Sequence, residues 1–163
     1  MGRIQAGEVL SASIEIAAPA DAVYALVSDV TRIPEWSPET VRVRRLGPAG
    51  FRSWNRRRLG VWRTDATIVE SIPGERFSFV VQAMGGDWTQ WTYRLEPGGD
   101  STRLTEEFRM CVALPTSILA FEWLFLLVRD RRADLRQNLE TSVARIGAII
   151  ESGAARRRTG EHP

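Results

Sequence analysis

The stretch FRSWNRRRLGVWRTDATIVESIPGERFSFVVQA, residues 51–83, decides the fold. Apolar and polar side chains alternate along three runs of it, 51–59, 61–72 and 76–83, as they do in half-buried β-strands. Only residue 60 and residues 73–75 separate these runs. A parallel crossover needs a dozen or more connecting residues, so the runs are predicted to pair as antiparallel hairpins.

The regions on either side complete the pattern. Runs 10–16, 40–46, 88–95 and 101–111 are further predicted strands, and two short helical segments are expected between the first two of these, from Pro19 and over 29–38. After Pro115 the apolar spacing becomes helical, along the stripe Ile118, Phe121, Phe125, Val128, Leu135, Leu139, Ile146 and Ile150. A helix over 116–151 would be about 50 Å long, so a break near 129–132 is predicted.

This order predicts one α+β domain, in which a curved antiparallel sheet of about seven strands wraps a long C-terminal helix and encloses an apolar cavity. We assign residues 8–152 to this domain, 1–7 to an N-terminal tail and 153–163 to a flexible basic tail. With 163 residues the chain has the usual size of a single domain.

Composition narrows the classes of function. All 22 lysine-or-arginine positions are arginines, which favours a bacterial origin. The net charge is only +2, which gives no argument for binding of nucleic acid. The single histidine, His162, lies in the tail, and neither a metal-ligand spacing nor a phosphate-binding loop is present, so no metal and no cofactor are expected. The apolar run 118–128 is short of the ~20 residues that span a bilayer, and no secretory signal precedes the first strand; a cytoplasmic protein is expected.

Three segments carry a family resemblance: IEIAAPADAVYALVSDVTRIPEWSP (14–38), residues 51–81 of the opening stretch, and WTQWTYRLEPGGDSTRLTEEF (88–108). Over residues 8–152 the chain resembles the START/Bet v1-like (SRPBCC) superfamily, specifically its bacterial polyketide cyclase/dehydrase and lipid-transport group. The resemblance implies a helix-grip fold with a hydrophobic cavity. Members of the group bind lipids, sterols or aromatic polyketides, and some catalyse cyclisation or dehydration.

Glu106 is the candidate for chemistry. Strand alternation places it on the same face as Leu104, Phe108 and Met110, so its carboxyl is expected on the apolar side, where desolvation raises a pKa. It is a candidate general acid or base, or a polar anchor for a ligand. Alternatively it pairs with a neighbouring arginine and only closes the cavity wall. Tyr93 is the second catalytic candidate.

The expected ligand contacts combine aromatic bulk with a few hydrogen-bonding groups, as amphipathic ligands require. They are Trp36, Asn55, Trp62, Phe79, Trp91, Tyr93, Glu106 and Phe121. Core packing is the alternative for any single aromatic. Entry is expected through the loops beside Trp36, at 85–86, or at the start of the last helix.

Two surfaces have open interpretations. One is a dense arginine cluster, which consists of Arg42, Arg44, Arg45, Arg52, Arg56, Arg57, Arg58 and Arg63. It indicates an anionic ligand, an acidic membrane surface or simply a solvated face. Because Trp54 is the only aromatic residue expected on the same face, the cluster does not fit a nucleic-acid site. The apolar stretch 114–128 is interpreted as a lid, a membrane contact or a contact with a second subunit, so a monomer or a homodimer is expected.

The leading functional hypothesis is binding or transport of a hydrophobic small molecule. The alternative is a polyketide aromatase/cyclase or dehydratase in which Glu106 or Tyr93 transfers protons. A third is a regulatory or interaction protein on the same fold.

Overall fold

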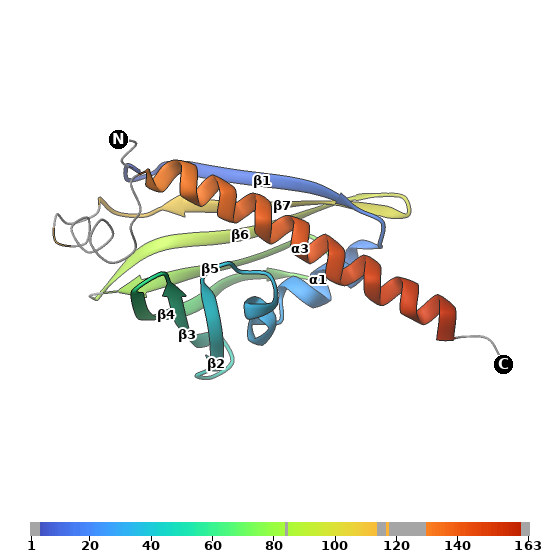
Figure 1. Cartoon of the computed structure of the whole chain (residues 1–163), viewed down its shortest axis with the longest axis horizontal. Coiled ribbons are helices and arrows are strands. Elements are labelled where there is room, and N and C mark those ends of the chain that lie inside the picture. Colours follow the sequence, from blue (N-terminus) through green and yellow to red (C-terminus); the bar gives the residue numbers. More distant parts are fainter. Residues whose placement is uncertain (1–3, 84, 114–116, 118–129, 161–163) are drawn as a thin grey trace.

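The computed structural model describes residues 4–83, 85–113, 117 and 130–160. Its strands are β1 (Val9–Ile16), β2 (Thr40–Arg45), β3 (Gly50–Arg57), β4 (Gly60–Ile72), β5 (Arg76–Ala83), β6 (Gly86–Gly98) and β7 (Ser101–Met110). They form one antiparallel sheet in the order β1-β7-β6-β5-β4-β3-β2 (Figure 1). The short helices α1 (Ala20–Val27) and η1 (Val30–Glu35) follow β1, and the long helix α3 (Arg131–Gly160) comes last. The predicted α+β helix-grip fold is confirmed.

Tight turns explain the antiparallel order. Between β3 and β4, Arg57 pairs with Gly60, so Arg58 and Leu59 alone form the turn, and Arg58 adopts φ 49°. A left-handed residue is what a two-residue hairpin requires, although glycine usually supplies it. Between β6 and β7 a glycine does so, since Gly99 has φ 75°.

Alternation along the strands sorts the side chains as expected. Phe77 and Phe79 on β5, Tyr93 on β6 and Leu104 on β7 are buried on the inner face of the sheet, where α1 covers one end. A second cluster of buried residues joins the sheet to the start of α3: Ile4, Leu10, Phe108, Met110, Leu135 and Leu139. The apolar side of the long helix therefore faces the sheet, as its stripe predicts.

The last helix starts later than its apolar stripe suggests. Asp130 is not helical, and its Oδ1 accepts hydrogen bonds from the backbone N–H groups of Arg132 and Ala133, each at 3.1 Å. An aspartate in this position caps a helix N-terminus, so α3 begins within the range 129–132 where a break is predicted. Of the stripe, Leu135, Leu139, Ile146 and Ile150 are buried, and its members before Asp130 lie outside the described residues.

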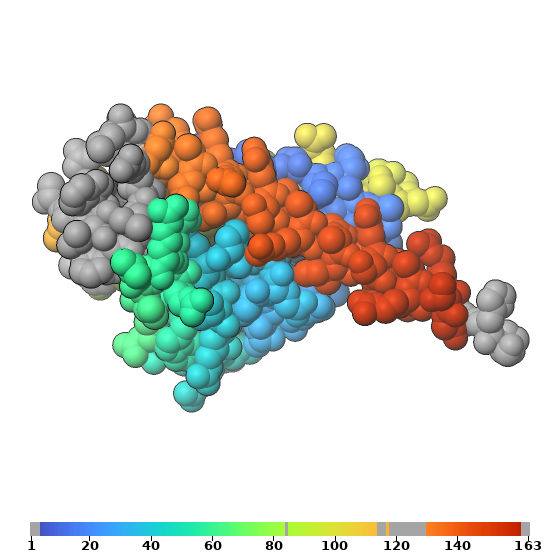
Figure 2. Space-filling view, viewed as in Figure 1, coloured from blue at the N-terminus to red at the C-terminus, as the bar shows by residue number. Residues whose placement is uncertain are grey.

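Both predicted tails need correction. Ile4 is buried against the sheet, and the Gly7 N–H donates to the Met110 carbonyl at 2.7 Å, so residues 4–7 pack onto β7. At the other end, 153–160 continue α3 instead of leaving it, and its last turns project beyond the sheet (Figures 1 and 2). Alanine and arginine are good helix formers, and Arg157 and Arg158 complement the negative end of the helix dipole.

No helix in the described part of the chain combines the length and the apolar character needed to cross a bilayer.

Candidate functional site

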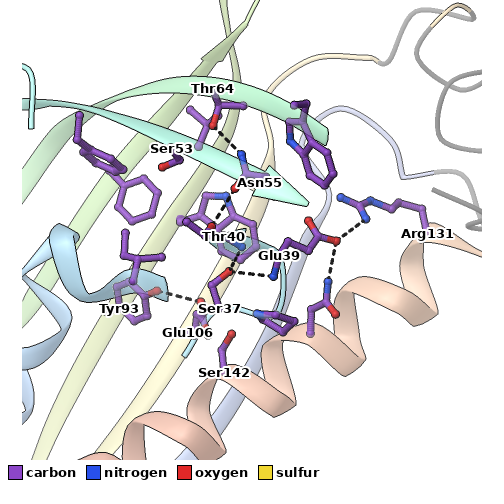
Figure 3. A pocket seen from close by; sticks show the side chains of 18 residues that line it. Ser37, Glu39, Thr40, Ser53, Asn55, Thr64, Tyr93, Glu106, Arg131 and Ser142 are labelled. Carbon is purple, nitrogen blue, oxygen red and sulfur yellow. Dashed lines mark hydrogen bonds and ion pairs between the residues drawn. The ribbon is translucent and has the colours of Figure 1, made fainter. Parts of the chain in front are cut away.

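A cavity of about 140 Å³ lies between the inner face of the sheet and the first turns of α3 (Figure 3). Strands β3 to β7, the loop after η1 and α3 all contribute to its wall. Its lining is aromatic and aliphatic with several polar side chains: Ile33, Ser37, Pro38, Glu39, Thr40, Phe51, Ser53, Asn55, Trp62, Thr64, Phe79, Val81, Trp91, Tyr93, Glu106, Arg131, Asn138 and Ser142.

Six of the eight expected ligand contacts line this cavity: Asn55, Trp62, Phe79, Trp91, Tyr93 and Glu106. Trp36 does not; it is completely buried behind Tyr93, which the sequence pattern could not distinguish from a position in the wall. Phe121 lies outside the described residues. That these side chains contact a ligand remains a prediction.

The wall is aromatic, and its polar groups are largely occupied. Phe51 and Phe79 meet edge to face with ring centroids 5.1 Å apart, a favourable geometry. The Asn55 side chain accepts from the Thr40 hydroxyl at 2.9 Å and donates to the Thr64 hydroxyl oxygen at 3.3 Å. A ligand therefore meets mainly apolar surface along this side.

Three buried side chains form a hydrogen-bonded chain at one end, which we call the floor: Trp36, Tyr93 and Glu106. Trp36 Nε1 donates to the Tyr93 hydroxyl at 3.1 Å, and that hydroxyl donates to Glu106 Oε1 at 3.0 Å. An indole N–H can only donate, so the tyrosine oxygen must accept from it and direct its own proton to the carboxyl. The floor thus fixes the orientation of the Glu106 side chain.

The other carboxyl oxygen, Glu106 Oε2, is buried and has no hydrogen-bond partner among the described residues. Burial raises the pKa of Glu106 to about 8, against smaller lowering effects of the Tyr93 and Ser142 hydroxyls. Ser142 lies beside the carboxyl (Figure 3) but outside the geometry that would satisfy Oε2. Glu106 is therefore mostly a neutral acid at pH 7, and within the described chain it forms no ion pair with an arginine.

The two catalytic candidates differ in availability. Burial and the neighbouring Glu106 raise the pKa of Tyr93 well above its ordinary value. Its hydroxyl already has both a donor and an acceptor partner, so its proton is committed to Glu106. Glu106, with one oxygen uncommitted, is the group that can exchange a proton.

Four charged side chains and one amide gather at the opposite, partly exposed end, and we call them the mouth network: Glu39, Arg57, Arg131, Asp134 and Asn138. Glu39 Oε1 accepts from Arg57 at 2.9 Å, Asn138 at 3.1 Å and Arg131 at 3.2 Å. Arg131 also contacts Asp134 Oδ2 at 3.1 Å, and Arg57 contacts Asp134 Oδ1. The network ties the loop after η1, the end of β3 and the first turns of α3 together.

Sequence reasoning missed most of this network. Arg131 and Asp134 lie off the apolar stripe of α3, a position that predicts solvent exposure, yet their side chains are only 20% and 13% exposed. Nothing in a single sequence pairs Glu39 with this helix. The one available signal was the number of polar residues in the first turns of α3, of which Arg131, Asp134 and Asn138 are half-buried at the cavity end.

The arginine cluster of 42–63 divides between two places. Arg57 joins the mouth network, whereas Arg42, Arg52 and Arg63 lie on the outer face of the sheet. There Arg42 stacks over Trp54 at 4.9 Å from the ring centroid, and Arg52 pairs with Asp65. The cluster is therefore not a single site.

Within the described residues, no group of three or more His, Cys, Asp or Glu side chains could hold a metal ion.

Comparisons with known proteins agree with this architecture. No curated protein matches the sequence. Among solved structures, the Polyketide_cyc-like protein Cgl2372 from Corynebacterium glutamicum is 28% identical, with 95% of this chain and 97% of that chain covered and a TM-score of 0.60. A START superfamily protein from Mycobacterium smegmatis is 21% identical, with coverages of 86% and 99% and a TM-score of 0.59.

A more distant structure is the di-domain ARO/CYC StfQ from the steffimycin biosynthetic pathway, 18% identical with a TM-score of 0.64. The alignment covers 91% of this chain but 46% of StfQ, so this chain corresponds to about half of that protein. The family model described as polyketide cyclase/dehydrase and lipid transport matches residues 8–146. With that match over most of its length and the helix-grip fold around a lined cavity, the chain belongs to the polyketide cyclase/dehydrase and lipid transport family.

Proposed function

We propose that this protein binds a hydrophobic small molecule in the cavity between its sheet and α3. The observation that carries the proposal is an aromatic-lined cavity with a buried carboxyl, Glu106, whose Oε2 has no hydrogen-bond partner among the described residues. Apolar walls with a few placed polar groups are typical of small-molecule sites. The family description and the START superfamily relative support the same assignment.

The cavity volume restricts the ligand. At about 140 Å³ it is below the ~300–1,000 Å³ of common ligand pockets. It is close to the ~150 Å³ apolar cavity that holds one benzene molecule. A cavity of this size accommodates about one aromatic ring, and a lipid, sterol or polyketide has to widen it or leave part of itself outside.

Native mass spectrometry of the protein incubated with a mixed lipid and aromatic polyketide extract tests binding. An adduct retained at its original mass supports a carrier. Val81→Phe, which fills the cavity, should abolish the adduct, whereas Val69→Phe on the exposed outer face of β4 should not. Equal adducts in both variants would place the ligand outside the cavity.

A second candidate function is a polyketide aromatase/cyclase or dehydratase, to which the ARO/CYC structures add support. The specific observation in its favour is that Glu106 is a buried acid with one uncommitted oxygen, as a general acid requires. Glu106→Gln separates the two functions. Binding should survive in a carrier, whereas turnover in a cyclase should fall by about 10²–10⁴. An interaction protein would show neither adduct nor product.

The location, oligomeric state and membrane contact of the protein are also proposals. We place the protein in the cytoplasm as a monomer or homodimer, with membrane contact through 114–128, a segment that lies outside the described residues except for Ser117. Light scattering after size exclusion measures the oligomeric state, and flotation with anionic vesicles measures membrane contact. A monomer that ignores vesicles would remove both the dimer and the membrane contact.

A further inference from the structure

Glu106 contributes a buried carboxyl oxygen without a hydrogen-bond partner to a cavity whose wall is largely aromatic and aliphatic near it. Its Oε1 is committed to the Tyr93 hydroxyl, and its Oε2 is buried without a partner in the described chain. A buried polar group that lacks a partner is unfavourable. A ligand that supplies the missing partner therefore gains affinity from this atom, in addition to what it gains from the aromatic wall.

The groups around Glu106 determine whether this missing partner is a donor or an acceptor. On β6 the neighbour is Tyr93, on β1 the residue opposite is Ala12, and on α3 it is Ser142. The charged groups that line the same cavity, Glu39 and Arg131, belong to the mouth network and contact each other. No cation of the described chain reaches Glu106 to hold it ionised, so its proton stays on the carboxyl at neutral pH.

The hydrogen bonds of the floor determine which oxygen of Glu106 carries the acidic proton. Because Tyr93 donates to Oε1, the acidic proton of Glu106 belongs on Oε2, the oxygen without a partner. We infer that the cavity selects ligands with a neutral carbonyl oxygen, to which Glu106 donates a hydrogen bond from Oε2. The inference rests on the proposed ligand binding and adds to it the ligand class, a ring-bearing ketone, aldehyde, quinone or lactone.

Other ligand chemistries fit this end less well. A ligand carboxylate would find no cation there among the described residues. An amine would need Glu106 ionised, and burial opposes that state, as the pKa of about 8 indicates. A pure hydrocarbon would leave Oε2 without a partner. A carbonyl oxygen satisfies a buried neutral donor without bringing in a charge.

Two probes of similar shape test the inference: acetophenone, which carries a ketone, and ethylbenzene, which does not. Binding to each is measured by calorimetry at about pH 6 and about pH 9.5, on either side of the titration of Glu106. At the lower pH the protein should bind acetophenone about tenfold more tightly, the effect of one net hydrogen bond. At the higher pH, where Glu106 has lost its proton, this preference should disappear.

Two variants connect the preference to Glu106. Glu106→Gln keeps an N–H donor in place of the acid, so it should prefer acetophenone at both pH values. Glu106→Leu should bind the two probes equally at both. If the leucine variant does not fold, the pH-independent preference of the glutamine variant still tests the donor.

The outcomes separate this inference from the proposed function. Equal binding of the two probes by the unmodified protein at the lower pH would overturn the carbonyl preference and leave cavity binding intact. Tighter binding of benzylamine than of acetophenone would overturn it too, since Glu106 would then act as an anion. If neither probe binds, the cavity function and this inference fall together.

Discussion

The cavity has two ends, and each contains a glutamate in a different chemical state. At the mouth, Glu39 receives hydrogen bonds from two arginines and an asparagine and remains 16% exposed. At the floor, Glu106 receives one hydroxyl and is 2% exposed. The same side chain is thus an anion within an ion-pair network at one end and a neutral acid at the other.

This difference shows how one small cavity combines closure with recognition. Paired charges at the mouth hold three chain segments together and still contact water, so breaking them costs little compared with breaking a buried pair. The floor is buried and its carboxyl is mostly neutral, so an uncommitted hydrogen-bonding group there has a large effect on what binds.

The largest expected effect concerns the pH dependence of stability. The pKa of Glu106 is about 8 in the folded protein against 4.5 ordinarily, so between these values the folded protein holds a proton that the unfolded chain has released. Stability should therefore fall as pH rises from about 5 to 8, by at most about 1.4 kcal/mol per pH unit, and level off above. Glu106→Gln should remove this component in denaturant titrations at several pH values. Parallel curves for the two proteins would refute a neutral Glu106.

A smaller effect is expected from Tyr93→Phe. Removing this hydroxyl leaves both the Trp36 N–H and Glu106 Oε1 buried without partners, which should cost about 2–4 kcal/mol. The matched control is Tyr24→Phe, because the Tyr24 hydroxyl contacts the exposed Ser71 at 2.6 Å and its loss should cost under about 1 kcal/mol. Chemical denaturation gives both values. Similar losses in the two variants would mean that the floor is not a linked chain.

The same Tyr93→Phe variant should shift the titration of Glu106. The Tyr93 hydrogen bond lowers the pKa of that carboxyl, so its removal should move the pH midpoint of the stability curve upward. A downward shift would show that Tyr93 stabilises the protonated acid instead.

The smallest effect is expected at the mouth. Glu39→Gln leaves Arg57 and Arg131 with Asp134 as the remaining anion of the network, and should cost about 1–2 kcal/mol, less in high salt. It should also speed release of a bound ligand, measured by stopped flow, because α3 loses a tie to the sheet. The control Asp65→Asn breaks the more exposed pair with Arg52 and should cost under about 1 kcal/mol without changing release. Unchanged release in Glu39→Gln would exclude the mouth network as a gate.

More of the floor than of the mouth network could be predicted from the sequence, and the reasons are physical. A two-residue period places Glu106 inward beside Leu104 and Phe108, because strand geometry leaves no other choice. It cannot show that Trp36 and Tyr93, 57 positions apart, share a hydrogen bond. The mouth depends on tertiary placement alone: Arg57 and Asp134 are 77 positions apart, and the helix pattern predicts solvent for the latter.

The aromatic wall between these two ends can change without disturbing the hydrogen bonds at either end. Phe51 and Phe79 have no polar atom, so exchanging either for a smaller residue would enlarge the space without removing a hydrogen bond from the floor or an ion pair from the mouth. Ligand size and ligand chemistry are then set by separate residues. A few substitutions along β3 and β5 could adapt the same recognition chemistry to larger molecules, which makes this fold easy to diversify by evolution or by design.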